Sequence, residues 1–240
     1  MNVWGITHRG AVRQQNQDSY QTQLLSDGRI LAIVCDGMGG ALAGNVASSM
    51  AVELFMERFE HYEGCRDDDE ARMKNAAALA NEQIFLRSTR DEECTGMGTT
   101  LVAALAGKDE AVILNEGDSR CYHVNESGIH LVTRDHSLVE DLVQRGELTR
   151  EEARTHPNKN LITRALGAEP VLLTDCFRQE LLPGDYLLLC SDGLSNVVDE
   201  QEILYEVIHG GDNETCCDRL LSIALSRGAP DNVTVVLIRR

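Results

Sequence analysis

Short apolar runs separated by polar turns recur along most of the chain, which is the pattern of β-strands. These runs occupy residues 3–7, 19–25, 29–35, 98–106, 111–115, 121–124, 186–190 and 233–238. Apolar positions at helical spacing predict helices over residues 42–59, 70–87, 200–209 and 214–226. A polar loop at 63–70 separates the first two helices. Because the helices precede and follow blocks of strands, the pattern indicates antiparallel sheets packed with helices.

The segment 137–160 differs from its surroundings because it is polar and lies among strands. Two short helices are predicted within it, at 138–144 and 149–154. The residues alone leave two interpretations open, a lid beside a site or a plain surface insertion. No linker or repeat divides the chain, so we expect one domain over residues 1–240.

Composition and charge narrow the class of protein. The 240 residues carry 22 basic and 39 acidic side chains, a net charge of −17. Such a surface repels phosphate backbones, so we expect neither a nucleic-acid partner nor binding to anionic membranes. No apolar run approaches the ~18 residues of a membrane span, and residues 1–17 lack the apolar centre of a signal peptide. The eight cysteines show no metal-binding spacing, which predicts a cytoplasmic protein with free thiols.

Aspartate beside glycine recurs where apolar runs end. Asp36, Asp118 and Asp192 each follow such a run, whereas Asp231 precedes the run at 233–238. If that last strand is antiparallel to the others, the four carboxylates meet at one edge of the sheets. Carboxylates this close repel one another unless cations neutralise them, and oxygen ligands without Cys or His suit Mg²⁺ or Mn²⁺. The alternative, that Asp-Gly pairs only mark turns, stays open at this point.

Arg13 lies in a polar stretch that ends at Asp18. An arginine in this setting forms either a surface ion pair or a planar fork that grips a phosphate beside the cations. The motifs of other phosphate-binding and hydrolytic sites, GxxxxGK[ST], GxSxG and HExxH, do not occur in the chain.

Eight short motifs between residues 13 and 234 resemble, in order, the bacterial branch of the metal-dependent serine/threonine protein phosphatases, the protein phosphatase 2C family. They are Arg13…Asn16-Gln17-Asp18, Asp36-Gly37-Met38-Gly39-Gly40, Gly98-Thr99-Thr100, Gly117-Asp118-Ser119-Arg120, Asp135-His136-Ser137, Thr163-Arg164-Ala165-Leu166-Gly167, Ser191-Asp192-Gly193 and Asp231-Asn232-Val233-Thr234. The resemblance covers essentially the whole chain. It implies an α+β fold, a four-layer αββα sandwich of two antiparallel sheets flanked by helices, with a flap at about 137–160 beside the active site.

The same resemblance implies a ligand set for two core metal ions. Asp36 would bridge the two ions, and the backbone carbonyl of Gly37 would bind one of them. Asp192 and Asp231 would complete one of the two sites. The implied cofactors are Mg²⁺ or Mn²⁺.

Three further roles follow from the resemblance. Asp18 would act on the metals through a coordinated water, Asp118 would hold a looser third ion together with Asp192, and Arg13 would bind the substrate phosphate. The implied reaction is hydrolysis of phosphoserine or phosphothreonine in proteins by a metal-activated water, without a phosphoenzyme. The enzyme would reverse a serine/threonine kinase in signalling, with phosphorylated proteins as partners and a monomeric state.

Two other function classes share these features. A pseudophosphatase would bind phosphoproteins without hydrolysing them, although such a protein normally lacks a metal aspartate and this chain lacks none. A hydrolase of small phosphate esters would use the same carboxylate cluster. Relative turnover of a phosphothreonine peptide and of a nucleotide separates these classes.

The chain departs from the family pattern at the proton donor. Met38 stands where many members have histidine, and Ala41 stands where some bacterial members have one. His136 and His156 are candidates for the general acid, and each also has a structural interpretation. Two other positions depart as well, with glutamine for a common glutamate at Gln17 and a charge where a hydrophobic residue is usual at Glu116.

Overall fold

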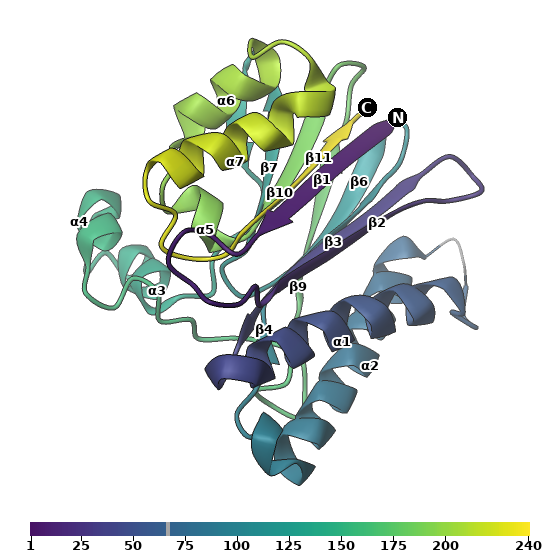
Figure 1. Cartoon of the computed structure of the whole chain (residues 1–240). Helices are drawn as coiled ribbons and strands as arrows, with labels where there is room; N and C mark the ends of the chain where they lie inside the picture. The colour runs from purple at the N-terminus through teal and green to yellow at the C-terminus, as the bar shows by residue number, and fades with distance from the viewer. Residues whose placement is uncertain (66–67) are drawn as a thin grey trace.

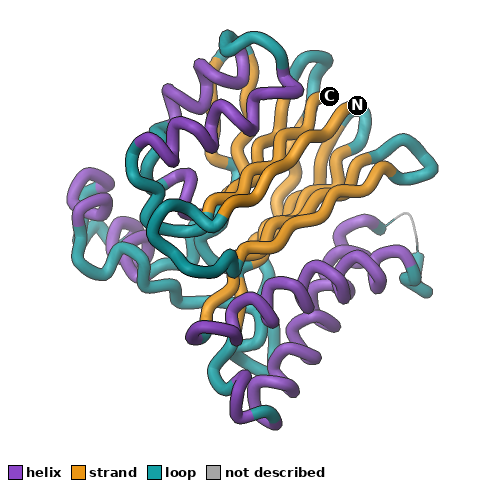
Figure 2. Tube along the Cα trace, in the orientation of Figure 1, coloured by secondary structure: helices purple, strands orange, loops and turns teal. Residues whose placement is uncertain are grey.

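The computed structural model describes residues 1–65 and 68–240, apart from the side chains of residues 41 and 42. Part of the predicted loop at 63–70 therefore lies outside the described residues. Two antiparallel sheets face each other, and a helical layer covers the outer face of each one (Figure 1, Figure 2). The αββα sandwich expected from the motifs is confirmed.

Each sheet combines strands from distant parts of the chain. The first sheet has the order β1 (Asn2–His8), β11 (Val233–Arg239), β10 (Tyr186–Cys190), β7 (Arg120–Asn125) and β8 (Gly128–Leu131). The second has the order β2 (Asp18–Leu24), β3 (Ile30–Met38), β5 (Leu101–Ala106), β6 (Glu110–Glu116) and β9 (Asp175–Glu180), and β4 (Gly98–Thr99) pairs with β3. Every pairing is antiparallel.

The helical layers lie where the sequence predicts helices. The helices α1 (Gly40–Glu60) and α2 (Asp69–Arg90) cover the second sheet, and α5 (Asp192–Ser195), α6 (Glu200–Ile208) and α7 (Cys216–Ser226) cover the first. Two short 3₁₀ turns, η1 (Glu92–Cys94) and η2 (Asn213–Thr215), precede β4 and α7. No helix among the described residues is long and apolar enough to cross a membrane.

The continuous apolar run of β3 follows from burial on both faces of its sheet. Leu31 and Ile33 pack in the core formed with α1 and α2, whereas Ala32 and Val34 pack in the core between the two sheets. Side chains alternate between the faces of a strand, so a strand covered on both sides is apolar throughout. This central strand delivers Asp36 to the edge of the sandwich.

Differences from the predicted elements lie mainly at the sheet edges. The strands β8 and β9 were not predicted, because both are edge strands with partly exposed, polar positions that break the apolar pattern. The predicted strand 98–106 is interrupted at Thr100, and the short helix α5 after β10 was not predicted.

The segment 137–160 contains the two predicted helices, α3 (Leu138–Gln144) and α4 (Arg150–Thr155). Ser137 caps α3 by accepting a hydrogen bond from the Glu140 amide, and Thr149 and Glu152 form a capping box at the start of α4. An isolated β-bridge between Ser137 and Ile162 closes the base of the segment. The segment therefore projects from the sandwich and returns where it left (Figure 1).

Candidate active site

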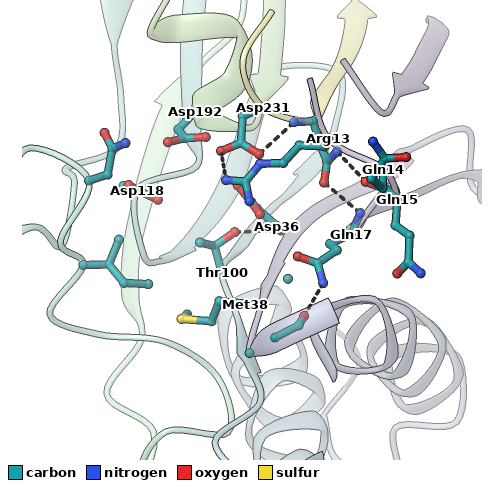
Figure 3. Close-up of a pocket in the computed structure, with 16 residues that line it drawn as sticks. Arg13, Gln14, Gln15, Gln17, Asp36, Met38, Thr100, Asp118, Asp192 and Asp231 are labelled. Atoms are coloured by element: carbon teal, nitrogen blue, oxygen red, sulfur yellow. Dashed lines mark hydrogen bonds and ion pairs between the residues drawn. The ribbon is translucent and has the colours of Figure 1, made fainter. Parts of the chain in front are cut away.

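A cavity of about 520 Å³ opens at one edge of the two sheets. Four carboxylates line it, those of Asp36, Asp118, Asp192 and Asp231, and Arg13 lines it beside them (Figure 3). The end of β3, the loop before β2, the residues next to β10 and β11, and the segment that follows α4 contribute to its wall.

Strand direction brings the four carboxylates together. In the second sheet β5 is antiparallel to both β3 and β6, so β3 and β6 end at the same edge and Asp36 and Asp118 lie there. In the first sheet Asp192 follows β10, and Asp231 precedes β11, which is antiparallel to β10. The edge expected from the sequence pattern is the edge at which the cavity lies.

The backbone of Asp36 is held by two threonines. The Thr100 Oγ1 accepts a hydrogen bond from the Asp36 amide at 2.9 Å, and the Thr99 Oγ1 donates one to the Asp36 carbonyl at 2.9 Å. The next residue, Gly37, crosses α1 so closely that an added Cβ would lie 2.0 Å from the carbonyl oxygen of Gly44. Only glycine fits at this crossing.

Asp18 lies behind the cavity wall. It pairs with Asp36 in the ladder between β2 and β3, and only 5% of its surface is exposed. Its Oδ2 accepts hydrogen bonds from Ser191 Oγ and Thr234 Oγ1, both at 2.7 Å, whereas its Oδ1 is buried without a partner. Burial raises the pKa of Asp18 to about 7, because the charged form loses hydration.

The pKa values of three of the carboxylates that line the cavity are raised as well. Burial, then repulsion from neighbouring aspartates, raises the pKa of Asp36 well above its usual value and that of Asp118 to about 8. The same two causes raise the pKa of Asp192 to about 6, and its Oδ1 is also buried without a partner. Two unpartnered carboxylate oxygens in an all-oxygen cluster fit a hard divalent cation. As they stand, however, no three acidic, His or Cys side chains among the described residues are arranged as a ready-made metal site.

Arg13 pairs with one of these carboxylates. Its Nη2 donates to Asp231 Oδ2 at 2.7 Å, and its side chain remains 53% exposed. The loop that carries Arg13 is tied to the start of β11 by Asn232, whose Nδ2 donates to the carbonyls of Arg9 and Gln15 at 2.9 Å. The guanidinium thus lies at the cavity as the counter-charge of an aspartate.

The two candidate proton donors lie away from the cavity, although position 38, where many family members have histidine, lies in its wall. Met38 lines the cavity, whereas neither His136 nor His156 is among the described residues that form its wall. His136 is 2% exposed and accepts the Gly117 amide hydrogen bond through Nδ1 at 3.0 Å. This contact favours a structural role for His136.

Several residues of the cavity wall had no individual role in the sequence analysis, among them Asn160, at the end of the predicted flap, and Ile162. Both follow α4 in the chain and line the cavity. No local pattern identifies them, because each is an ordinary residue in a polar segment and only the return of that segment to the sheet edge brings it to the cavity.

The sequence and the structure match those of characterised proteins over almost their full length. The sequence model of the family described as Protein phosphatase 2C matches residues 5–216. The serine/threonine phosphatase stp of Listeria welshimeri is 39% identical over 236 residues, covering 98% of this chain and 94% of that protein. The crystal structure of Stp1 from Staphylococcus aureus matches with a TM-score of 0.93 at 37% identity, covering 99% of this chain and 94% of that one. The PstP catalytic domain in complex with two manganese ions matches with a TM-score of 0.86 at 33% identity, covering 98% of this chain and 96% of that one.

A two-sheet sandwich with aspartates gathered at one edge, together with similarity of this extent, defines the class of protein. The chain belongs to the protein phosphatase 2C family and is a serine/threonine protein phosphatase. The family resemblance stated from the eight motifs is confirmed. The roles of its individual residues stay predictions.

Proposed function

We propose that this enzyme hydrolyses phosphoserine and phosphothreonine in proteins with the help of Mg²⁺ or Mn²⁺. It would thereby reverse the phosphorylation catalysed by a serine/threonine kinase. The observation that carries the proposal is the cluster of four aspartates and one arginine around a single cavity, in a chain of this family. The manganese complex of the PstP catalytic domain supports the choice of metal.

Oxygen atoms of the cluster would hold the ions. Asp36, the carbonyl of Gly37, Asp192 and Asp231 would form the two core sites, with Asp18 acting through water. When bound, such ions supply Lewis-acid charge and a water that ionises near pH 7. The Ser191 and Thr234 hydroxyls each donate to one oxygen of Asp18 and leave its other oxygen free to accept.

Asp118 would hold the third, looser ion together with Asp192. Both carboxylates line the cavity, and the charge of Asp192 contributes to the raised pKa of Asp118. Asp118→Asn is expected to remove one Mn²⁺ from the binding stoichiometry while the two core ions stay bound. Unchanged stoichiometry, counted by calorimetric titration, would remove this assignment.

Removal of metal is the direct test of the proposed function. Hydrolysis of a phosphothreonine peptide is expected to stop in excess chelator and to return when Mn²⁺ is added in excess of the chelator. Full activity in chelator would contradict the metal-dependent reaction. Peptide binding without turnover in Mn²⁺ would indicate a pseudophosphatase, and faster turnover of a nucleotide would indicate a small-ester hydrolase.

Arg13→Ala is expected to raise the KM for a phosphothreonine peptide about tenfold, because a hydrogen bond to a charged group contributes about 1.5–3 kcal/mol. Arg13 would exchange Asp231 for the substrate phosphate, which accepts its planar fork in the same way. Steady-state kinetics at saturating Mn²⁺ measure the effect. Arg9→Ala on the same loop serves as the matched control, and a loss confined to kcat would argue against phosphate binding by Arg13.

We propose further that residues 1–240 act as one catalytic domain in which the segment 137–160 is a flap for substrate recognition. The position of Asn160 in the cavity wall supports this role. Asn160→Ala is expected to reduce kcat/KM on a phosphothreonine peptide more than on an aryl phosphate, because the smaller substrate reaches less of the flap. Equal losses on the two substrates would show that the flap does not recognise the peptide.

A further inference from the structure

Four polar residues form a connected network at the base of the flap, and none of them lines the cavity. Arg164 lies at its centre and donates to Glu116 Oε2 at 2.9 Å and to Asp175 Oδ1 at 3.0 Å. The His136 Nε2 lies 3.1 Å from the other oxygen of Asp175. We call these residues, Glu116, His136, Arg164 and Asp175, the flap-base network.

Glu116 is the member of the network whose charge is unfavourable to bury. It ends β6 with only 3% of its surface exposed, at a position where the family usually has a hydrophobic residue. Burial raises the pKa of Glu116 to about 7, and the nearby charge of Arg164 acts against that rise. Arg164 contacts both carboxylate oxygens, through Nη2 and, at 3.3 Å, through Nε. A buried carboxylate is tolerated only with such a partner, so the two residues depend on each other.

His136 joins the network to the backbone beside Asp118. Its Nδ1 accepts from the Gly117 amide at 3.0 Å, and its Nε2 lies 2.9 Å from Arg164 Nη1 and 3.1 Å from Asp175 Oδ2. Its own amide donates to the Gly117 carbonyl at 2.9 Å, and its carbonyl accepts from the Thr163 amide at 2.8 Å. Burial lowers the pKa of His136, because the charged ring would lose its hydration.

The network therefore touches both ends of the flap and the loop that carries Asp118. The flap begins at Ser137, directly after His136, and the chain returning from it passes through Thr163, directly before Arg164. Glu116 and Gly117 lead straight into Asp118. Buried polar networks whose members are all partnered act as rigid units.

We propose that the flap-base network positions Asp118 and the flap as one unit, with Glu116 and Arg164 as positioning residues. The flap-side cavity wall, which includes Ile162, is then held in register with the Asp118 carboxylate. The metal-binding part of this inference rests on the proposed role of Asp118, whereas the mechanical coupling does not.

Hydrogen exchange of the metal-free protein tests the coupling directly. The double variant Glu116→Val, Arg164→Met replaces the ion pair with apolar side chains, an exchange that commonly preserves folding. Amides of the Gly117–Ser119 loop and of the segment 137–163 are expected to exchange faster together in this variant. The matched control is Arg178→Met, which removes the ion pair that an arginine of β9 forms with Glu110, at the opposite end of β6 from Glu116.

Faster exchange in only one of the two segments, in neither, or equally in the Arg178→Met control would overturn the coupling. Glu116→Gln keeps the size of the side chain and provides a second variant in case the double variant does not fold. It is expected to change both segments in the same direction, and wild-type exchange in Glu116→Gln would count against the proposal.

Manganese binding gives an independent readout, measured by the electron paramagnetic resonance signal of free Mn²⁺. The affinity of the weakest Mn²⁺ site is expected to fall roughly tenfold in the double variant, because losing the residues that hold a metal ligand in place commonly weakens binding by this factor. The stronger sites are expected to keep their affinity. Asp118→Asn is measured in parallel. If Asp118→Asn loses the weak site while the double variant keeps wild-type affinity, the positioning role of the network is wrong and the metal role of Asp118 still holds. If Asp118→Asn keeps every site, the proposed metal role of Asp118 fails, and hydrogen exchange still decides the coupling.

Discussion

Replacement of Asp36 by asparagine is expected to reduce kcat/KM on a phosphothreonine peptide by about 1,000-fold or more, a loss of at least ~4 kcal/mol of transition-state stabilisation. Asp36 lies at the cavity among the other three aspartates, and the proposed function places it between both core ions. Asparagine has nearly the same size and retains the backbone hydrogen bonds to Thr99 and Thr100. The loss would therefore report the missing charge and not a displaced strand.

Asp109→Asn is the matched control for this substitution, because Asp109 lies at the far end of β6 with its side chain 84% exposed. It is expected to keep wild-type activity. Metal-free Asp36→Asn is expected to melt no lower than the metal-free wild type, since the substitution relieves repulsion among buried carboxylates. Activity of Asp36→Asn within tenfold of wild type would contradict the proposed bridging role.

The metal-free enzyme is expected to lose stability as pH rises from about 4 to about 8. The pKa values of Asp192, Asp18 and Asp118 rise from 3.8 to about 6, 7 and 8 in the folded chain. Between each pair of values the folded chain binds more protons than the unfolded chain, so the free energy of unfolding falls with increasing pH. Added Mn²⁺ competes with protons for the same carboxylates and is expected to restore stability mainly at the alkaline end.

Thermal unfolding at pH 5 and pH 8, with and without Mn²⁺, measures this effect. A net charge of −17 also favours unfolding at high pH, so the informative quantity is the difference between wild type and Asp118→Asn. His136 acts in the opposite direction, because burial lowers its pKa below 6.5 and stability gained from it rises with pH up to that value. If the stability of the wild type falls between pH 5 and pH 8 no more than that of Asp118→Asn, Asp118 does not contribute to the effect.

Some parts of the candidate site could be predicted because their signal is local. Asp36 and Asp192 could be predicted because each follows an apolar run and precedes a glycine. A strand buried on both faces is apolar throughout, and glycine is required beside Asp36 where the chain crosses α1. The two helices of the flap were also predicted from the sequence pattern, and the structure contains both. The edge strands β8 and β9 were not, because exposure removes the apolar pattern on which strand prediction depends.

The sequence by itself determined the central strands, the longer helices and the aspartates beside them, because periodicity and turn residues act over a few positions. Only the tertiary structure decided that Asp18 lies behind the cavity wall, that Arg13 pairs with Asp231, and that Asn160 completes the wall. It also decided that Glu116 is partnered by Arg164, 48 residues further along the chain. Such contacts arise because the packing of two sheets brings segments that are distant in the sequence together at one edge. No local sequence pattern indicates which segments meet there.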